Sequence, residues 1–154
     1  MGDAANAALS GRTSCDDRSP AGAACVFSKA LLACTAVCDR ATRRSVGERE
    51  WVLCTSPVAH TNCSTLAALL HERARFALRL PSPGQPVIHA QALRLQCGGL
   101  IGVQQALGAA QPDVHHMVGV AHERYGSLTE LPWGAIVQTL MQWQAQRPRR
   151  PARP

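Results

Sequence analysis

The chain has 154 residues, of which 46% are hydrophobic and 17% are charged, so its composition excludes a disordered chain and predicts one globular domain. Aromatic residues make up only 4%, so the core has to be built from Leu, Ala and Val, which favours packed helices over sheets. The net charge is +6, but four of these charges belong to the C-terminal RPRRPARP, and the remaining +2 (6 − 4) does not require a nucleic-acid partner.

The first 63 residues show little regular periodicity. Residues 1–14 are small and polar, which predicts a flexible lead. The segment FSKALLACTAVCDRATRR predicts a short helix that places Cys34 and Cys38 one turn apart, so that both can face the same site. The segment REWVLC predicts a short extended piece. Six of the seven cysteines lie in this part of the chain, at residues 15–63.

The rest of the chain shows the three- and four-residue spacing of apolar residues that is typical of helices. Asn62 or Ser64 is expected to cap the first helix, and Pro81 to end it. In the second helix, the pair Gly98–Gly99 either breaks the helix or lets another backbone approach closely. The four predicted helical segments are 64–80, 87–110, 112–126 and 131–146.

These elements predict a mainly α fold, in which a loop-rich, cysteine-bearing N-terminal segment (15–63) packs on a four-helix C-terminal body (64–146). Both parts are expected to share one core in a single domain, 15–146, followed by a basic Pro/Arg tail, 147–154. No stretch approaches the ~18 consecutive apolar residues of a membrane helix, and the N-terminus lacks the pattern of a secretory signal. We therefore expect a cytoplasmic protein without membrane insertion, whose clustered cysteines serve as metal ligands or reactive thiols rather than as disulfides.

The spacing of the six clustered cysteines is C-x9-C-x8-C-x3-C-x15-C-x8-C. It contains neither the C-x2-C pairs of structural zinc sites nor the compact run of bacterial ferredoxins. A metal site here has to gather its ligands from separated loops and helix ends. Because an iron–sulfur cluster is larger than a single ion, it can bridge ligands that zinc would have to draw closer together. The spacing therefore favours a [4Fe–4S] cluster over zinc.

We predict that the ligands are Cys25, Cys38, Cys54 and Cys63. Cys63 is the strongest candidate, since it lies near a predicted helix start, where free N–H groups and the helix dipole lower the pKa of a thiol. Alternative ligands are Cys15, Cys34 and, for a zinc site, His60, while Cys97 lies in an apolar helical segment and is expected to belong to the core.

The leading hypothesis for function is a small iron–sulfur protein that acts in electron transfer or redox sensing beside a larger redox protein or enzyme complex. The alternative is a zinc-stabilised nucleic-acid-binding or protein-interaction module, with Cys25, Cys54, His60 and Cys63 as ligands. A metal-free thiol redox protein is a third possibility, and cysteines that only fill the core are a fourth. The sequence identifies no catalytic residues, so an electron carrier or accessory protein is favoured over an enzyme, and nucleic-acid binding is not the favoured role.

Overall fold

A computed structural model of the protein describes residues 22–146, which hold five α-helices, one 3₁₀-helix and a three-stranded sheet. The predictions for Cys15, for the lead 1–14 and for the tail 147–154 lie outside this range. In chain order the elements are β1 (Ala23–Ala24), α1 (Ser28–Leu32), β2 (Ala41–Val46), β3 (Arg49–Cys54), α2 (Pro57–Leu78), α3 (His89–Leu107), α4 (Val114–Tyr125), η1 (Leu128–Glu130) and α5 (Trp133–Gln142).

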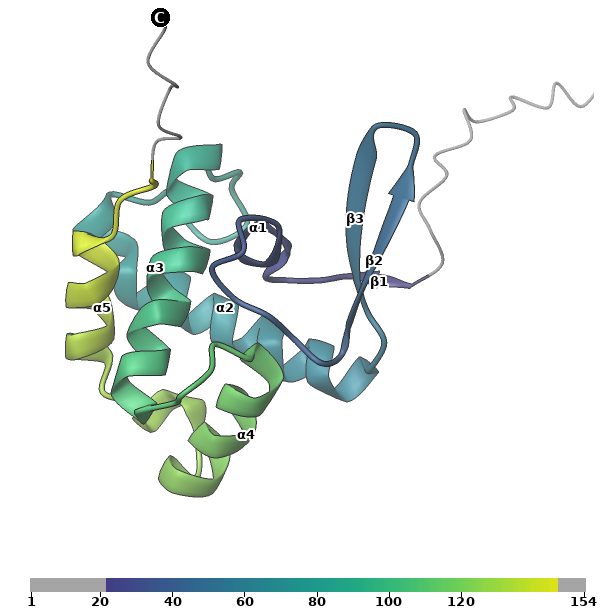
Figure 1. Cartoon of the computed structure of the whole chain (residues 1–154). Coiled ribbons are helices and arrows are strands. Elements are labelled where there is room, and N and C mark those ends of the chain that lie inside the picture. The colour runs from purple at the N-terminus through teal and green to yellow at the C-terminus, as the bar shows by residue number, and fades with distance from the viewer. Residues whose placement is uncertain (1–21, 147–154) are drawn as a thin grey trace, which may run out of the picture.

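Helices dominate the described part of the chain, so the prediction of a mainly α protein is confirmed. Helix α3 lies in the middle of the helical body and contacts α2, α4 and α5 (Figure 1). The small sheet lies on the side of this body where α2 begins. None of the helices within residues 22–146 has both the length and the apolar character needed to cross a membrane.

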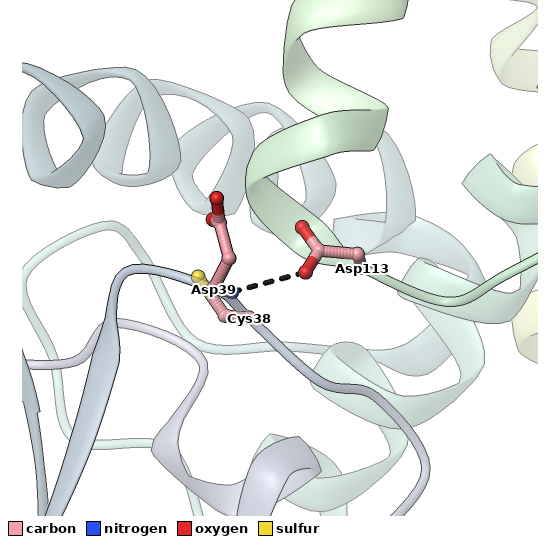
Figure 2. A group of neighbouring side chains, drawn as sticks. All are labelled: Cys38, Asp39 and Asp113. Carbon is pink, nitrogen blue, oxygen red and sulfur yellow. Dashed lines mark hydrogen bonds between the residues drawn. The ribbon is translucent and has the colours of Figure 1, made fainter.

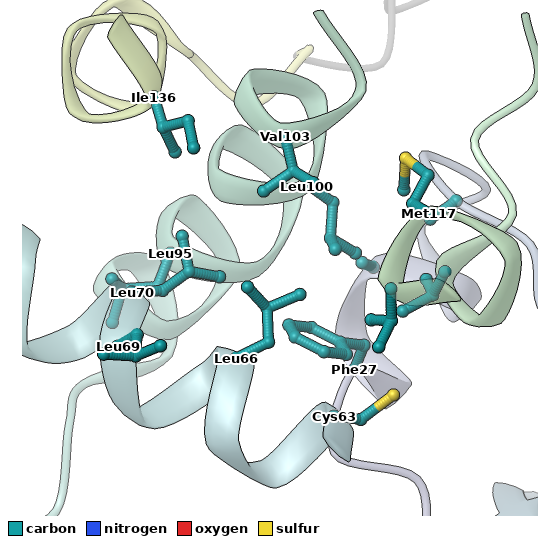
Figure 3. Packing of buried hydrophobic residues seen from close by; sticks show 14 of the residues in the cluster. Phe27, Cys63, Leu66, Leu69, Leu70, Leu95, Leu100, Val103, Met117 and Ile136 are labelled. Atoms are coloured by element: carbon teal, nitrogen blue, oxygen red, sulfur yellow. The ribbon is translucent and has the colours of Figure 1, made fainter. Parts of the chain in front are cut away.

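The helical segments bury most of the residues that their apolar spacing selects. Leu66, Leu69 and Leu70 of α2 are buried, whereas Leu78 near the end of that helix is only partly buried and Ala77 is exposed. In α4 and α5 the buried residues are Val114, Met117, Val118, Ala121, Trp133, Ile136 and Leu140. Phe27 comes from the N-terminal segment and inserts its ring beside Leu66 (Figure 3), so this segment and the helices share one core.

The glycine pair in α3 does not break the helix, which runs unbroken from His89 to Leu107. A Cβ atom on Gly98 would lie 2.9 Å from the Cβ of Trp143, and one on Gly102 would lie 2.9 Å from the carbonyl oxygen of Ile136. At Gly98 a second backbone does approach closely, since an added Cβ would lie 3.1 Å from the Cα of Leu140, whereas at Gly99 it would lie 2.7 Å from the Leu70 side chain. The missing side chains let α5 pack against the backbone of α3.

The cysteine-bearing segment is less loop-rich than predicted, because it contains an antiparallel sheet with strand order β1-β3-β2. The prediction that REWVLC is extended is confirmed, since it forms β3. The predicted helix through Cys34 and Cys38 is wrong. It ends at Leu32, Cys34 has a left-handed backbone with φ of 56°, and the following chain leads into β2.

Helix α2 begins seven residues earlier than the predicted helix 64–80. Ser56 is its N-cap and accepts a hydrogen bond from the N–H of Ala59 (3.2 Å), and Pro57 occupies the first turn, where its missing N–H has no cost. Cys63 consequently lies in the second turn of α2 and not at its start. Neither Asn62 nor Ser64 caps this helix.

Candidate metal centre

The four cysteines predicted as ligands line one pocket in the structure. Cys25, Cys38, Cys54 and Cys63 come from four separate places in the chain, and His60 lies at the same pocket. The other side chains that line it are apolar: Val26, Phe27, Leu31, Ala41, Ala59 and Val114. The structure therefore places four thiols around a common, water-poor space.

Three of these cysteines are positioned by the sheet. Cys25 follows β1 and donates its N–H to the carbonyl of Val52 in β3 at 2.8 Å. Cys54 is the last residue of β3, and its backbone lies between Ala23 of β1 and Ala41 of β2. Cys38 precedes Ala41 by three residues, and its carbonyl accepts a hydrogen bond from the Ala41 N–H at 3.2 Å. Strand pairing thus brings together residues that lie 13 to 29 positions apart in the sequence.

Cys38 is also held by the start of α4. On its N-terminal side, Val37 pairs with the chain at Asp113, through hydrogen bonds from Val37 N–H to the Pro112 carbonyl (3.0 Å) and from Val114 N–H to the Val37 carbonyl (2.9 Å). On its other side, the N–H of Asp39 donates to the Asp113 carboxylate at 3.0 Å (Figure 2). The backbone on both sides of Cys38 is therefore fixed to one helix end.

Helix α2 supplies the fourth thiol and the histidine. Cys63 is buried and lies beside Phe27, at the boundary between the pocket and the core (Figure 3). His60, one turn earlier, places its Nε2 3.1 Å from the carbonyl oxygen of Ala24. This contact links α2 to β1, and it means that Nε2 of His60 already has a hydrogen-bond partner.

Burial raises the pKa of three of the four thiols. The effect is largest for Cys63, whose pKa rises to about 12, first through burial and then through the neighbouring Cys38, Cys25 and Cys54. The pKa values of Cys25 and Cys38 are also raised, again mainly by burial. This corrects our expectation that a helix start lowers the pKa of Cys63, because that residue lies one turn too deep in α2.

Backbone N–H groups act against burial at two of the sulfurs. The N–H of Phe27 lowers the pKa of Cys25, and the N–H groups of Arg40 and His115 lower that of Cys38, although burial remains the larger cause at both sites. The Cys54 thiol instead donates to the carbonyl of Ser56, at 3.2 Å. Donors directed at sulfur stabilise its anionic form, which is the form that binds a metal.

The spacing of the ligand atoms distinguishes between an ion and a cluster. Tetrahedral Zn–S bonds of about 2.3 Å hold the sulfurs about 3.8 Å apart. Within residues 22–146, no three cysteine or histidine ligand atoms lie within 4.8 Å of one another. The four thiols therefore surround the pocket more widely than a single zinc ion requires.

The pocket is nevertheless narrow. Its cavity volume is about 10 Å³, which is room for about one water molecule. A cluster therefore needs the thiols to turn outward, and Cys25, Cys38 and Cys54 are only half-buried, at the edge of the molecule, where such a rotation is possible.

Within residues 22–146, the two other cysteines, Cys34 and Cys97, do not line this pocket. Cys34, an alternative ligand in our sequence analysis, is exposed and its thiol faces the carbonyl of Leu32 at 3.9 Å. Cys97 is fully buried in the core, as predicted, and the side chain of Thr35 lies within hydrogen-bonding reach of it.

One group of ligand atoms that sequence reasoning missed consists of Cys38, Asp39 and Asp113, which lie within 4.8 Å of one another. Each carboxylate oxygen already faces a donor. Asp113 caps α4 through the His116 N–H (2.9 Å) and accepts from the Asp39 N–H, while Asp39 faces His115 at 2.9 Å and Arg40 at 3.6 Å. Helix capping and ion pairing explain these carboxylates without a metal. The sequence signal for the cap was Pro112 followed by Asp113.

Comparison with models of known protein families, with curated proteins and with solved structures finds no match to this chain. The residues of the pocket are therefore the basis for assigning its chemistry.

Proposed function

We propose that this chain binds a [4Fe–4S] cluster through Cys25, Cys38, Cys54 and Cys63 and acts in one-electron transfer or redox sensing beside a larger protein. The observation that carries the proposal is the convergence of four thiols, separated by up to 38 positions, on one apolar pocket. Cysteines that only fill a core are buried, whereas three of these four are half-buried at its edge.

The protein groups around the pocket suit a centre that changes charge by one electron. When bound, the cluster would accept and release that electron at a potential set by burial and by hydrogen bonds to sulfur. The apolar lining from Phe27, Leu31 and Val114 limits the access of water. The N–H groups near Cys25 and Cys38 stabilise negative charge on sulfur.

A zinc site is the weaker candidate for two reasons. Among the described residues, no three cysteine or histidine ligand atoms lie within 4.8 Å of one another, so one zinc ion would require the thiols to turn inward. In addition, His60 is the histidine of the predicted zinc set, and its Nε2 already contacts the Ala24 carbonyl. Binding zinc through that nitrogen would break the link between α2 and β1.

The hairpin of β2 and β3 suggests how a partner is held near the pocket. It projects from the helical body (Figure 1). Its inner face contacts the body, since Arg43 donates to the Leu31 carbonyl at 2.7 Å and Val52 is buried. Paired residues share a face of the sheet, so the strand register places Arg44, Val46, Arg49 and Trp51 together on the outer face.

Within β2 and β3 no acidic residue shares that outer face, because the register places Glu50 opposite Ser45 on the inner one, and Glu48 lies in the turn between the strands. We therefore propose that the outer face meets an acidic surface of the partner protein, with β3 leading directly to Cys54. Electron transfer to an acidic flavodoxin, used as a probe, should slow with rising salt and slow further in an Arg44→Glu, Arg49→Glu double variant. An electron-transfer rate that changes neither with salt nor in the double variant would overturn this part of the proposal. Tight, salt-dependent binding of duplex DNA would favour the nucleic-acid alternative.

Metal analysis of anaerobically purified protein tests the proposed cluster. We expect about four iron and four sulfide per chain, a brown colour and an absorption band near ~400 nm that bleaches on reduction. A Cys63→Ser variant should lose iron, while Cys34→Ser, which alters an exposed thiol outside the pocket, should retain it. A colourless protein with one zinc per chain would contradict the proposal, as would iron binding that survives Cys63→Ser unchanged.

A further inference from the structure

We propose that Gln96 of α3 is a positioning residue that fixes the peptide next to Cys25 and thereby sets the reduction potential of the centre. This inference rests on the proposed cluster. It follows from a set of hydrogen bonds that link the middle of α3 to the turn carrying the first thiol.

The Gln96 side chain contacts that turn three times. Its Oε1 accepts from the N–H groups of Lys29 (3.0 Å) and Ala30 (3.2 Å), and its Nε2 donates to the carbonyl of Val26 at 3.0 Å. Helix α1 has no side-chain N-cap of its own, so the amide of Gln96 takes that role from 66 residues away. One side chain thus uses both its acceptor and its donor on a segment of five residues.

The contact with Val26 is the one that reaches the thiol. The carbonyl of Val26 and the N–H of Phe27 belong to the same planar peptide unit, and they point in opposite directions. When Gln96 holds the carbonyl, the N–H is directed away from α3. It lies in the turn that carries Cys25, which is closed by the bond from the Ser28 N–H to the Cys25 carbonyl at 3.2 Å, and it opposes the effect of burial on the pKa of the Cys25 thiol. A hydrogen bond to the carbonyl also polarises the peptide and strengthens its N–H as a donor.

A hydrogen bond to a ligand sulfur favours the more negative, reduced state of a cluster. Loss of the Gln96 contact should therefore lower the reduction potential. Gln91 provides a matched comparison, since it lies in the same helix and donates through its Nε2 to the backbone carbonyl of Leu78 at 3.1 Å, at the opposite end of α2 from Cys63.

The test has a metal-free arm and a loaded arm. In metal-free protein, amide hydrogen exchange should show faster exchange at Phe27 in Gln96→Met, but not in Gln91→Met. In Gln96→Glu, the carboxylate still accepts from Lys29 and Ala30 but cannot donate to Val26. Exchange should then quicken at Phe27 and stay slow at Ala30, which separates positioning of the peptide from capping of α1.

In loaded protein, Gln96→Met should keep its iron content and shift to a lower midpoint potential, while Gln91→Met should match the parent. An unchanged Phe27 amide would overturn the inference whether or not metal binds. A loosened Phe27 amide with an unchanged potential would reduce Gln96 to a structural role and overturn it as well. If the parent protein binds no iron, the proposed function fails, while the exchange measurements still decide whether Gln96 fixes this peptide.

Discussion

The interface between α3 and α5 and the cysteine pocket are built in opposite ways. At the interface, Gly98 and Gly102 remove side chains so that the α5 backbone at Leu140 and Ile136 fits directly against α3. At the pocket, strand ends and a helix turn meet through thiols that are spaced apart, three of which remain partly accessible.

The difference lies in how the groups of each region are satisfied. The interface gains its stability from contacts that are already made, so any added atom is a disturbance. The pocket raises the pKa of its thiols by burial while directing amide donors at two of them, two effects that oppose each other in the absence of a cation. The proposed metal centre would supply the positive charge that reconciles these two effects.

The largest expected effect is that of removing the metal. Stripping the cluster under anaerobic conditions should lower the free energy of unfolding by on the order of 4 kcal/mol, the value that linkage gives for a ligand at about a thousand times its dissociation constant. Urea unfolding of loaded and metal-free protein measures the difference. In the Cys63→Ser variant the two unfolding curves should coincide. If the unfolding free energy of the parent protein is the same with and without iron, the contrast drawn between the two regions is wrong.

An effect of similar size concerns Phe27, which belongs to both the core and the pocket wall. Phe27→Ala should cost about 3–5 kcal/mol of unfolding free energy, because it leaves a cavity in a fully buried site, and the variant should also lose iron faster. Phe76→Ala is the matched control, since that ring is 89% exposed and its removal should change stability by less than about 0.5 kcal/mol. Equal losses in the two variants would contradict the packing described here.

A smaller effect tests the close interface. In Gly102→Ala the new methyl group would lie 2.9 Å from the Ile136 carbonyl oxygen, so α5 has to move, at a cost of about 1–3 kcal/mol. Gly119 in α4 has open space around its Cα, and Gly119→Ala should be neutral or stabilising by up to about 1 kcal/mol. Thermal unfolding of the two variants gives the comparison, and iron content should stay normal in both.

The smallest effect is one of pH in metal-free protein. Because the folded pKa of Cys63 lies near 12, above its ordinary value of 9.0, the folded state retains this proton longer than the unfolded state. Its contribution to stability is therefore complete below pH 9 and is lost as the pH rises toward 12. Between pH 9 and pH 10 the parent should lose up to about 1.4 kcal/mol more than Cys63→Ala. Urea titrations at both pH values test this, and parallel losses would show that Cys63 is not desolvated.

The sequence predicted the helices well because apolar spacing reports burial directly, as in Leu66, Leu69 and Leu70. It missed β2 because the arginines of that strand are exposed on both sides and leave no alternation to detect. It placed the start of α2 too late, although Ser56 followed by Pro57 is a recognisable capping signal.

For the site, thiol chemistry and spacing were enough to select four cysteines that the fold brings to one pocket. The sequence could not show which backbone amides face them. The donors at Phe27 and His115 depend on how a turn and a helix end pack, and Gln96 reaches Val26 from 70 residues away. Contacts between residues so far apart in the sequence produce no local sequence pattern that would predict them.

The shortest element of the described fold leads directly to one wall of the pocket. Strand β1 pairs with β3 through only two residues, both exposed, yet it delivers Cys25. A strand this short frays more readily than the helices around it, and fraying would swing one wall of the pocket aside while the other three thiols stay in place. We expect iron to enter, and oxygen to attack, along this route. Amide exchange at the Cys25 N–H, which bonds to Val52 at 2.8 Å, would measure how often it opens.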